Sequence, residues 1–549
     1  MQNSITIVVS GEAGQGLQTM ESLLVEAIST RYHVFSTSEV MSRVRGGNNT
    51  FSLRIAGERI FAYRSEIDYL FLLNDHALGR LSKRITPSTQ ILDRHNLPMN
   101  NGKPRELNAV IMGFVSGMLA LDLQVSQAIV GAFFTKKNQE EGDASLKAFD
   151  RGFEQGLRFA SKPAFLKPHD NTDSKSLDKT YKIADGTQAV GIGALGGGCN
   201  FVAAYPMSPG TGLLAFMADH GISAGVLVEQ AEDEIAALNM VIGAWYAGAR
   251  GLTTTSGGGF SLMQEAVSLA GMTETPCVIH VGQRPGPATG MPTRTEQADL
   301  NLVVYAGHGE FPRIVLAPGS LEDGVILGQK AFYLADKYQV PVFILTDQFY
   351  LESKGQMTRL TLSGDFLKQH IIKTELDYRR YRLNESGISP RGIPGFGQGL
   401  VKVDSDEHDE YGMITEDFDL RIAMNDKRLG KEALILAEYE NPELIGPENY
   451  EHLLIGWGST YGVCREYIMT AAKPDTAFLH LKQVYPLSPG LKPYFDRAKS
   501  VTVIEGNATG QLADLLRLRL NVLVTNRILK YNGEPFSIEE IEKQLGEVL

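Results

Sequence analysis

The chain has 549 residues, which is too long for one hydrophobic core and predicts three or four domains. Its net charge of -12 argues against binding to nucleic acid or to an anionic membrane, because both need clustered Lys and Arg. The chain has no apolar run long enough to span a bilayer, and its first residues lack the features of a secretory signal peptide, so we expect a cytoplasmic protein.

The first predicted domain is an α/β domain over residues 1–165, followed by a linker over 166–180. Its opening stretch, "SITIVVSGEAGQGLQTMESLLVEAI", has the pattern of a β-branched strand, a glycine turn and an amphipathic helix. The glycines of "GEAGQG" do not stand in the dinucleotide-binding order, and no P-loop motif occurs. A glycine turn before a helix can hold an anion through free backbone N–H groups, and Arg43 and Arg45 follow nearby. A tight turn with solvated arginines fits the spacing equally well.

The second predicted α/β domain covers residues 181–352. Buried-strand patterns such as "PCVIHVG" and "PVFILTD" alternate there with helical runs, which is typical of a parallel sheet. The pattern weakens over 353–445, and we interpret that polar, Gly- and Pro-containing stretch as an irregular connecting segment that is functional or lies against another subunit. Strand–turn–helix units return over 446–549 and predict a third α/β domain.

The cysteines exclude several kinds of site within this chain. Cys199, Cys277 and Cys464 lie far apart, and no CxxC pair occurs. This spacing rules out a disulfide framework, a zinc ribbon and a ferredoxin-type iron–sulfur motif. We expect all three cysteines to be buried as small hydrophobic residues.

Two glycine-containing stretches of the second domain are candidates for ligand contact. "TSGGGF" and "GQRPGPATGMPTRTEQADL" both follow buried strands, and α/β proteins bind ligands at the carboxyl ends of their strands. Arg284 is the cation nearest one of these strand ends, and arginine binds carboxylates in a bidentate manner. From the residues alone, a surface ion pair is the favoured interpretation of Arg284.

Four carboxylates occur within the stretch "VEQAEDEIAA". We expect Glu229 to end a strand, and Glu232 and Asp233 to occupy the first turn of a helix, where the helix dipole favours negative charge. Glu234 is expected to point inward, because it shares a helical face with the largest apolar side chains, Leu238, Val241 and Trp245. Small or apolar residues also line the neighbouring face, so the periodicity alone does not single out Glu234.

Together, these motifs resemble the 2-oxoacid:ferredoxin oxidoreductases over nearly the whole chain. "GEAGQG" and "SEVMSRVRGGNNTFSLRI" are similar to the γ domain of that family. "YPMSPGTG", "VEQAEDEIAALNMVIGAWYAGARGLTTTSGGGFSLMQEA" and "RPGPATGMPTRTEQADL" resemble the pyrimidine-binding domain of its α subunit. "ESGISPRGIPG", "DEHDEYG", "IGWGST" and "EGNATGQLA" are similar to the rest of that subunit, particularly in the 2-oxoglutarate branch. The chain therefore resembles a fused γ–α subunit.

The resemblance implies three α/β domains: a γ domain, a thiamine-enzyme pyrimidine-type domain with a parallel sheet, and a transketolase C-terminal-like domain. It also implies oxidative decarboxylation of a 2-oxoacid, with 2-oxoglutarate preferred, by thiamine diphosphate and coenzyme A. The products would be an acyl-CoA (succinyl-CoA), carbon dioxide and reduced ferredoxin. The same chemistry on pyruvate, branched-chain or aryl 2-oxoacids stays open. So do a transketolase-like or NAD-linked thiamine enzyme and a non-catalytic scaffold that binds coenzyme A or a nucleotide.

The resemblance also implies a partner chain. Thiamine enzymes hold the diphosphate and Mg²⁺ through a GDG motif, and this sequence has no GDG and no cysteine cluster. We therefore expect no metal site on this chain, and a β subunit that carries Mg²⁺ and a [4Fe-4S] cluster. The expected assembly is a heterodimer or an (αβ)₂ heterotetramer that passes electrons to ferredoxin.

The family's site residues can be carried over to matching positions. Glu234 matches the glutamate that contacts N1′ of the cofactor's aminopyrimidine, a contact that activates the cofactor and needs a carboxylate shielded from water. The other cofactor-binding candidates are Tyr205, Pro206, Thr255 and Ser256. Ser208 stands where the family usually has threonine; both carry a hydroxyl for the substrate, but serine leaves a slightly roomier pocket.

The remaining candidates concern the two anionic reactants. Arg284 matches the family's arginine for the substrate carboxylate. Arg294 is a candidate for binding the distal carboxylate of 2-oxoglutarate, although the partner subunit can supply the binding group instead. Coenzyme A is expected to meet the γ domain, where N–H groups and positive charge for its phosphates would come from Gly14, Gln15, Gly16, Arg43 and Arg45.

Overall fold

The computed structural model describes most of the chain and divides it into two compact units. The described residues are 4–41, 47–74, 77–93, 95–98, 104–134, 139–159, 181–471 and 473–548. Unit 1 consists of Met1–Asp185, Glu352–Arg359 and Ser537–Lys543, and unit 2 consists of Gly186–Leu351, Leu360–Phe536 and Gln544–Leu549. Among the described helices, none is long and apolar enough to cross a membrane.

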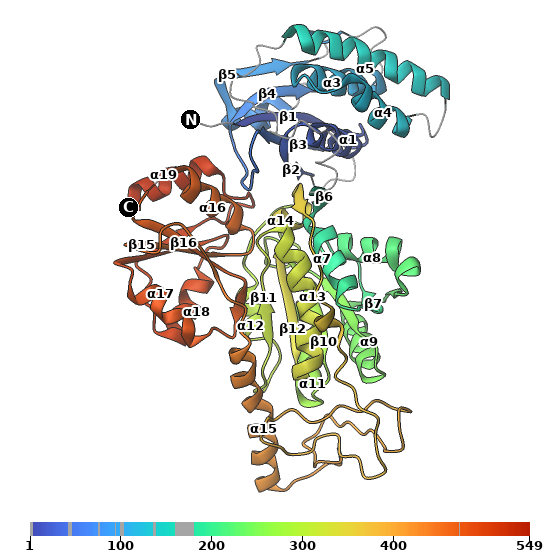
Figure 1. Cartoon of the computed structure of the whole chain (residues 1–549), viewed down its shortest axis with the longest axis vertical. Coiled ribbons are helices and arrows are strands. Elements are labelled where there is room, and N and C mark those ends of the chain that lie inside the picture. Colours follow the sequence, from blue (N-terminus) through green and yellow to red (C-terminus); the bar gives the residue numbers. More distant parts are fainter. Residues whose placement is uncertain are drawn as a thin grey trace. The chain divides into compact units, whose positions relative to one another are not determined.

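Unit 1 is built on one mixed sheet with a helical layer (Figure 1). The strand order is β5 (Ile85–Leu92), β4 (Ile67–Leu72), β1 (Ser4–Glu12), β3 (Asn48–Ala56), β2 (His33–Glu39), β13 (Lys354–Thr358) and β6 (Tyr181–Asp185). The helices that pack on the sheet and on one another are α1 (Leu17–Ser29), α3 (Pro104–Met118), α4 (Leu123–Phe134) and α5 (Gln139–Phe159). The short helix α2 covers Ala77–Leu81.

Two strands of this sheet come from beyond the predicted first domain. β6 lies in the stretch assigned to the second domain, and β13 follows that stretch, yet they pair with each other antiparallel and β13 pairs with β2. A buried carboxylate helps to fix them: Glu21 of α1 accepts a hydrogen bond of 2.8 Å from Lys354 Nζ at the start of β13. Its carboxylate also accepts from Ser36 and Ser38 of β2, so the buried charge is fully paired.

Helices α3 and α5 lie unusually close together because both present glycines at the crossing. A Cβ atom on Gly113 of α3 would lie 2.0 Å from the carbonyl oxygen of Phe149, and one on Gly152 of α5 would lie 2.1 Å from that of Val110. Gly117 and Gly156 repeat the arrangement one turn further along. The two backbones therefore touch, and no residue larger than glycine fits between them.

Unit 2 contains a second sheet of seven strands that is parallel except at one edge. Its order is β17 (Gln483–Tyr485), β11 (Ile314–Leu316), β12 (Pro341–Asp347), β10 (Cys277–Gln283), β9 (Gly251–Thr255), β7 (Phe201–Ala204) and β8 (Leu227–Gln230), with β17 antiparallel to β11. The central strands β10 and β12 are buried along their whole length, as continuous apolar runs of a parallel sheet predict.

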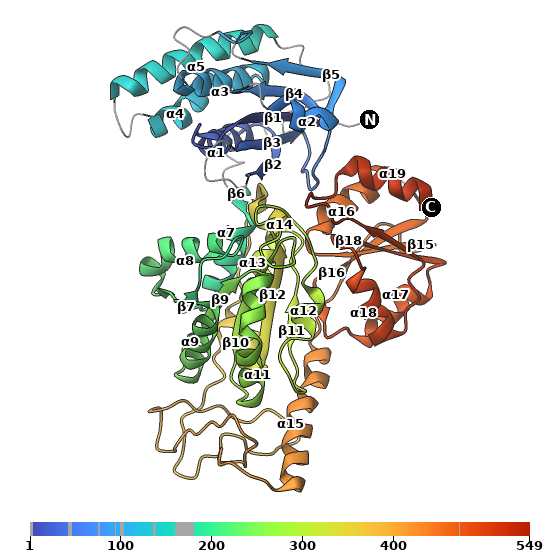
Figure 2. The ribbon, with the colours of Figure 1, turned by 180° about the vertical axis from the view of Figure 1, so that it is seen from behind.

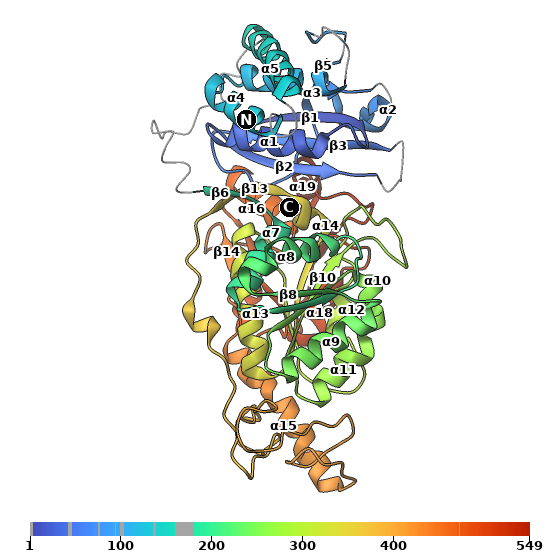
Figure 3. The same ribbon diagram turned by 90° about the vertical axis from the view of Figure 1, so that its right-hand side faces the viewer.

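Helices flank both sides of this sheet. Figure 3 shows α13 (Leu321–Tyr338) on one side, and α9 (Glu234–Tyr246) and α11 (Gln264–Met272) on the other. α7 (Gly186–Gly196) packs against α13 and α8 (Thr211–Ala224). The short helices near the strand ends are α10 (Gly257–Phe260), α12 (Leu300–Val304) and α14 (Gln348–Glu352). This is a doubly wound α/β arrangement, whose ligand sites form at the carboxyl ends of the strands.

The third sheet also lies in unit 2, near the end of the chain (Figure 2). Its order is β14 (Glu443–Ile445), β16 (Thr476–Leu481), β15 (His452–Trp457), β18 (Ser500–Glu505) and β19 (Asn526–Leu529). Its helices are α16 (Thr460–Ala471), α17 (Lys492–Asp496) and α18 (Gln511–Leu520), and α19 (Ile538–Val548) follows. The three sheets confirm the predicted α/β class with three α/β regions. The three cysteines are free and buried, as expected, and burial raises the pKa of the Cys199 thiol to about 12.

The stretch interpreted as an irregular segment has little regular structure before Phe418 and then forms a long helix, α15 (Phe418–Ala437). Its buried face consists of Met424, Lys427, Arg428, Lys431 and Ile435. Three of these side chains are basic, so the hydrophobic periodicity that would reveal a packed helix is absent from the sequence.

Buried ion pairs hold α15 and the irregular segment against the rest of unit 2. The Glu274 carboxylate, after α11, pairs with both Lys427 and Lys431 of α15. The Asp336 carboxylate of α13 pairs with Arg250 at 3.0 Å and with Arg391 of the irregular segment at 2.6 Å. Each of these four buried cations contacts a carboxylate, which reduces the penalty for burying it, and each carboxylate is shared by two cations.

Replacing Gly152 with Ala is expected to loosen unit 1. The added methyl group would clash with the Val110 carbonyl oxygen. This overpacking should lower the free energy of unfolding by about 1–3 kcal/mol, which exceeds the stabilisation expected from the higher helix propensity of alanine. Hydrogen exchange of the α3 and α5 amides measures this loss. Gly131→Ala in α4 is the matched control, because its methyl group would meet only the Leu146 side chain at 3.5 Å. Equal protection in the two variants would contradict the close helix contact.

Candidate functional site

The loops after β7, β9 and β10 meet at the carboxyl ends of these neighbouring strands. The loop after β7 folds back onto β9, where the Thr254 hydroxyl donates a 3.1 Å hydrogen bond to the carbonyl oxygen of Gly210. The same loop covers β10: a Cβ atom on Gly282 would lie 2.9 Å from the ring of Pro209. The strand ends and the loop residues 205–210 therefore form one site within unit 2.

A buried polar chain ties the three central strands together beneath this site. Thr254 Oγ1 of β9 lies 2.8 Å from Nδ1 of His280 in β10, and His280 Nε2 lies 2.9 Å from Thr346 Oγ1 in β12. Because the Thr254 hydroxyl gives its proton to Gly210, the His280 ring donates from Nδ1 and accepts at Nε2. Burial lowers the pKa of His280 to about 3, so the ring is neutral and structural.

The structure brings two predicted substrate residues together. Arg284 Nη1 donates a 2.7 Å hydrogen bond to the backbone carbonyl oxygen of Ser208. This bond uses one of the five guanidinium donors and fixes the side chain beside the loop after β7. Tyr205 and Ser208 are exposed and Pro206 is half-buried, so this part of the site opens to solvent. Burial lowers the pKa of Arg284, and the Asp299 carboxylate opposes that effect.

The four carboxylates near the start of α9 lie in different environments, and the sequence prediction is partly wrong: Glu232 precedes the helix and Asp233 is its N-cap, so the first turn contains Glu234 and neither of these two residues. Glu229 lies in β8 and is exposed, as is Glu232. Asp233 is the N-cap of α9, and its carboxylate accepts a 2.8 Å hydrogen bond from the backbone N–H of Ala236. Glu234 alone is buried, with 3 % of its surface exposed.

The Glu234 carboxylate sits against a glycine turn and lacks a donor. A Cβ atom on Gly259 of α10 would lie 2.5 Å from Glu234 Oε1 and 2.2 Å from Thr255 Oγ1, so only glycine leaves room for these two groups. Oε1 is buried without a hydrogen-bond partner, and so is Oγ of the fully buried Ser256. Buried oxygens without donors are costly, so this cluster is suited to a ligand that brings N–H or O–H groups.

Sequence reasoning missed one titratable residue of the site, Asp299, although it belongs to the quoted stretch "RTEQADL". Its backbone N–H donates a 3.0 Å hydrogen bond to Gln283 Oε1 at the end of β10. Its carboxylate packs against α10, where a Cβ atom on Gly257 would lie 2.3 Å from Oδ2. Burial raises the pKa of Asp299 to about 6, and the Arg284 charge works against that rise.

Arg294 lies at the next strand end along the sheet. The neighbouring Thr295 donates its hydroxyl to Asp347 Oδ1 at the end of β12 (3.0 Å) and its backbone N–H to the Gly533 carbonyl oxygen (3.2 Å). A Cβ atom on Gly533 would lie 3.2 Å from Arg294 Cβ. Arg294 is therefore placed between β12 and the loop after β19, whereas Arg284 follows β10.

The predicted anion site of unit 1 is described only in part. Gly14 and Gly16 have φ values of 89° and 77° in the turn between β1 and α1, a conformation that favours glycine. The Gln15 side chain folds back and accepts a 2.7 Å hydrogen bond from the Glu12 N–H, while its carbonyl accepts from Asn108. Gly16 is the N-cap of α1 and provides no side-chain cap. Arg43 and Arg45 lie outside the described residues.

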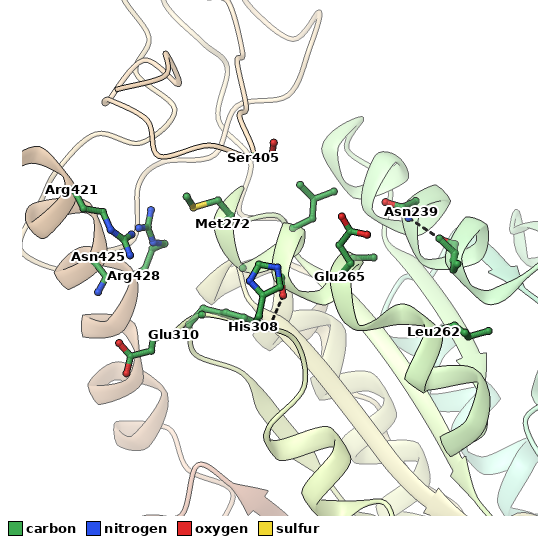
Figure 4. A pocket seen from close by; sticks show the side chains of 17 residues that line it. Asn239, Leu262, Glu265, Met272, His308, Glu310, Ser405, Arg421, Asn425 and Arg428 are labelled. Atoms are coloured by element: carbon green, nitrogen blue, oxygen red, sulfur yellow. Dashed lines mark hydrogen bonds between the residues drawn. The ribbon is translucent and has the colours of Figure 1, made fainter. Parts of the chain in front are cut away.

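A separate cavity of about 620 Å³ lies on the outer side of α9 and α11. Figure 4 shows Arg421, Asn425 and Arg428 projecting from α15 across this cavity from Asn239 and Leu262. None of the predicted site residues lines it. In the part of the chain that the structure describes, no cluster of three or more His, Cys, Asp or Glu side chains could hold a metal ion.

Comparisons with known proteins agree on one family. The profile described as "Pyruvate flavodoxin/ferredoxin oxidoreductase, thiamine diP-bdg" matches residues 192–427, and that described as "Pyruvate ferredoxin/flavodoxin oxidoreductase" matches residues 6–155. The α subunit of a 2-oxoacid:ferredoxin oxidoreductase from a Sulfolobus species is 31 % identical, over 99 % of this chain and 96 % of its own length. A 2-oxoglutarate synthase subunit of Methanocaldococcus jannaschii is 32 % identical, over 66 % of this chain and 98 % of its own length.

A solved structure is similar over its full length. It is the 2-oxoglutarate:ferredoxin oxidoreductase from Magnetococcus marinus with 2-oxoglutarate, coenzyme A and succinyl-CoA bound. Its chain is 29 % identical to this one, and the match covers 100 % of both chains with a TM-score of 0.91.

Replacing Thr254 with Val is expected to destabilise unit 2. The change leaves the Gly210 carbonyl and the His280 N–H without partners in the core, which should lower the free energy of unfolding by about 1–3 kcal/mol. Denaturant unfolding followed by tryptophan fluorescence measures it, because Trp245 and Trp457 both lie in unit 2. Thr253→Val is the control: that hydroxyl is buried without a partner, so its loss should be neutral or stabilising. A larger loss in the control would contradict the role given to Thr254.

Proposed function

Because the chain belongs to the 2-oxoacid:ferredoxin oxidoreductases, as an alpha subunit with a thiamine-diphosphate-binding domain, we propose that it oxidatively decarboxylates 2-oxoglutarate together with a β subunit. 2-Oxoglutarate and coenzyme A would give succinyl-CoA and carbon dioxide, and the released electron pair would pass to ferredoxin. The observation that carries the proposal is the buried Glu234 carboxylate, whose Oε1 lacks a donor beside Gly259.

The residues at the strand ends fit the aminopyrimidine of thiamine diphosphate. Glu234 Oε1 would hold a proton at N1′, and that contact would satisfy an oxygen that otherwise has no partner. Thr255, Ser256, the exposed Tyr205 and the half-buried Pro206 would line the ring. When bound, thiamine diphosphate supplies the carbon nucleophile and the electron sink for the decarboxylation. The protein contributes the buried position of Glu234, which keeps water from competing for N1′.

Arg284 and Ser208 would bind the substrate next to the cofactor. The guanidinium is fixed by its bond to the Ser208 carbonyl and keeps further N–H donors for the carboxylate beside the 2-oxo group. The Ser208 hydroxyl would donate to the oxoacid group. Arg294, at the neighbouring strand end, is proposed for the distal carboxylate. The names of the M. jannaschii relative and of the M. marinus enzyme support 2-oxoglutarate as the substrate.

The proposed enzyme also needs a binding site for coenzyme A and a partner subunit. Gly14, Gln15 and Gly16 form the turn before α1. The Gln15 N–H already donates to the Glu12 carbonyl oxygen, so the backbone N–H groups of Gly14 and Gly16 would bind the phosphates of coenzyme A, with Gln15 shaping the turn and Arg43 and Arg45 supplying charge. The bound coenzyme A of the M. marinus enzyme supports this co-substrate. We assign Mg²⁺ and the [4Fe-4S] cluster to the β subunit, in a cytoplasmic (αβ)₂ assembly.

Replacing Glu234 with Gln in the assembled complex should lower turnover about 100-fold or more, because an amide cannot hold the proton at N1′. Viologen reduction with 2-oxoglutarate and coenzyme A measures it, and gel filtration checks that the complex still assembles. Glu232→Gln removes an exposed carboxylate from the same stretch and should leave turnover unchanged. Near-normal turnover of the Glu234 variant would refute its assignment.

A panel of 2-oxoacids tests the substrate. With a cationic site for a second carboxylate, kcat/KM for 2-oxoglutarate should exceed that for pyruvate, branched-chain or aryl 2-oxoacids by about tenfold or more. Faster reduction of ferredoxin with one of those acids would support the proposed reaction but show that 2-oxoglutarate is not the preferred substrate. Reduction of NAD without ferredoxin would point instead to an NAD-linked thiamine enzyme.

A further inference from the structure

Gln297, in the stretch "RTEQADL", is a buried residue to which the proposed reaction gives no role. Its side-chain amide donates a 2.9 Å hydrogen bond from Nε2 to the Trp457 carbonyl oxygen at the end of β15. Its Oε1 accepts a 2.8 Å hydrogen bond from the backbone N–H of Gly506, which follows β18. The Gln297 side chain therefore lies between the ends of two neighbouring strands of the third sheet and is bonded to both.

The Gln297 backbone is bonded to the loop after β18 as well. Its N–H donates a 2.6 Å hydrogen bond to the Gly506 carbonyl oxygen, and its carbonyl oxygen accepts a 3.1 Å hydrogen bond from Asn507 Nδ2. Asn507 is fully buried, and its amide also donates to the Glu505 carboxylate at 2.9 Å and accepts from the Gly510 N–H at 2.7 Å. The partners of Gln297 are therefore themselves held in place by hydrogen bonds.

Two glycines leave room for the Gln297 side chain. A Cβ atom on Gly458, the residue after β15, would lie 2.9 Å from Gln297 Nε2, and one on Gly506 would lie 3.2 Å from its Cγ and Oε1. Gly458 also has a φ of 54°, a conformation that favours glycine. These glycines belong to "IGWGST" and "EGNATGQLA", two motifs to which the proposed reaction gives no role. Each motif therefore contains a glycine that admits Gln297.

Gln297 and Thr295 together fix the backbone that follows Arg294. The Thr295 N–H donates to the Gly533 carbonyl oxygen after β19, and the Thr295 hydroxyl donates to the Asp347 carboxylate at the end of β12. The position of Arg294 thus depends on loops of the third sheet, those after β15, β18 and β19, in addition to the strand end of the second sheet.

Arg284 is held in a different way at the other end of the same loop. Its guanidinium is bonded to the Ser208 carbonyl oxygen, on the loop after β7. Between the two arginines the chain closes a turn, in which the Met291 N–H donates a 3.0 Å hydrogen bond to the Pro285 carbonyl oxygen. These contacts lie within the loop and the second sheet, so a shift of the third-sheet loops would move Arg294 more than Arg284.

We propose that Gln297 is a positioning residue for Arg294, and that the third sheet thereby sets the preference for a 2-oxoacid with a second carboxylate. The inference rests on the proposed function, because it needs Arg294 to bind the distal carboxylate of 2-oxoglutarate. Arginine binds a carboxylate most strongly in a bidentate geometry, so a small displacement of its backbone weakens that contact. Arg284 and the reacting 2-oxo group would keep their positions.

Gln297→Met tests the proposal in the assembled complex. Methionine has a similar length but offers no amide to Trp457 or Gly506. Viologen reduction compares 2-oxoglutarate with 2-oxopentanoate, which has a methyl group in place of the distal carboxylate. The KM for 2-oxoglutarate should rise about tenfold or more, while kcat and the kcat/KM for 2-oxopentanoate stay unchanged. If 2-oxopentanoate turns over too slowly, its competitive inhibition constant against 2-oxoglutarate serves instead of kcat/KM.

Gly506→Ala tests the same contact from the third sheet and removes no hydrogen-bonding group. Its methyl group would lie 3.2 Å from Gln297 Cγ and Oε1, so the glutamine side chain must shift slightly. The KM for 2-oxoglutarate should rise by a smaller factor, and the values for 2-oxopentanoate should stay unchanged. This variant decides the question if the Gln297→Met complex does not assemble.

Gln329→Met is the matched control. Gln329 of α13 is also buried, and its Nε2 donates to the carbonyl oxygens of Gly196 (3.0 Å) and Ser363 (2.9 Å), while its Oε1 accepts from the Ser363 N–H (3.2 Å). Its replacement should lower the midpoint of denaturant unfolding, as that of Gln297 should, because both leave buried backbone groups without partners. The ratio of kcat/KM for the two acids should change only in the Gln297 variant.

Three outcomes would overturn the inference alone: an equal loss for both acids in the Gln297→Met complex, no loss for either acid, or the same selective loss in the Gln329→Met complex. A native complex that prefers monocarboxylic 2-oxoacids would overturn the inference together with the proposed substrate. Failure of the native complex to oxidise any 2-oxoacid would overturn the proposed function and the inference with it.

Discussion

The site depends on one constraint: the Glu234 carboxylate is buried at the start of α9 and must be accommodated there. Asp233 caps the helix, so Glu234 is not needed for that purpose and its side chain is free to turn inward. Gly259 leaves the space that its Oε1 occupies. A buried carboxylate oxygen without a donor is unfavourable in isolation, and such unfavourable arrangements persist at sites where a ligand completes them.

Hydrogen bonds elsewhere in unit 2 hold the strands and loops around Glu234 in fixed positions. The chain from Thr254 through His280 to Thr346 fixes three adjacent strands, and the Thr254 hydroxyl ties the loop that carries Ser208 to β9. Glu234 at the start of α9 and Arg284 after β10 belong to the same compact unit, as the proposed cofactor and substrate contacts require. Buried ion pairs of Asp336 and Glu274 fix the irregular segment and α15 without contributing to these strand ends.

Much of this arrangement can be predicted from the sequence, because local sequence patterns determine it. Alternating strands and helices predict the parallel sheet, and the shared face with Leu238, Val241 and Trp245 predicts that Glu234 is buried. Helix α15 escapes prediction, because Lys427 and Lys431 occupy its buried face. The pairing of β6 and β13 in unit 1 is also missed, since it joins short strands far apart in the chain. Asp299 gives no local signal, because the burial of its Oδ2 atom comes from packing against Gly257.

The most direct test of the account is the structure of the assembled complex with thiamine diphosphate bound. The account predicts that a carboxyl oxygen of Glu234 lies within hydrogen-bonding distance, about 2.6–3.2 Å, of N1′ of the aminopyrimidine. An aminopyrimidine whose N1′ faces solvent or another side chain, with Glu234 left unpartnered beside Gly259, would contradict it.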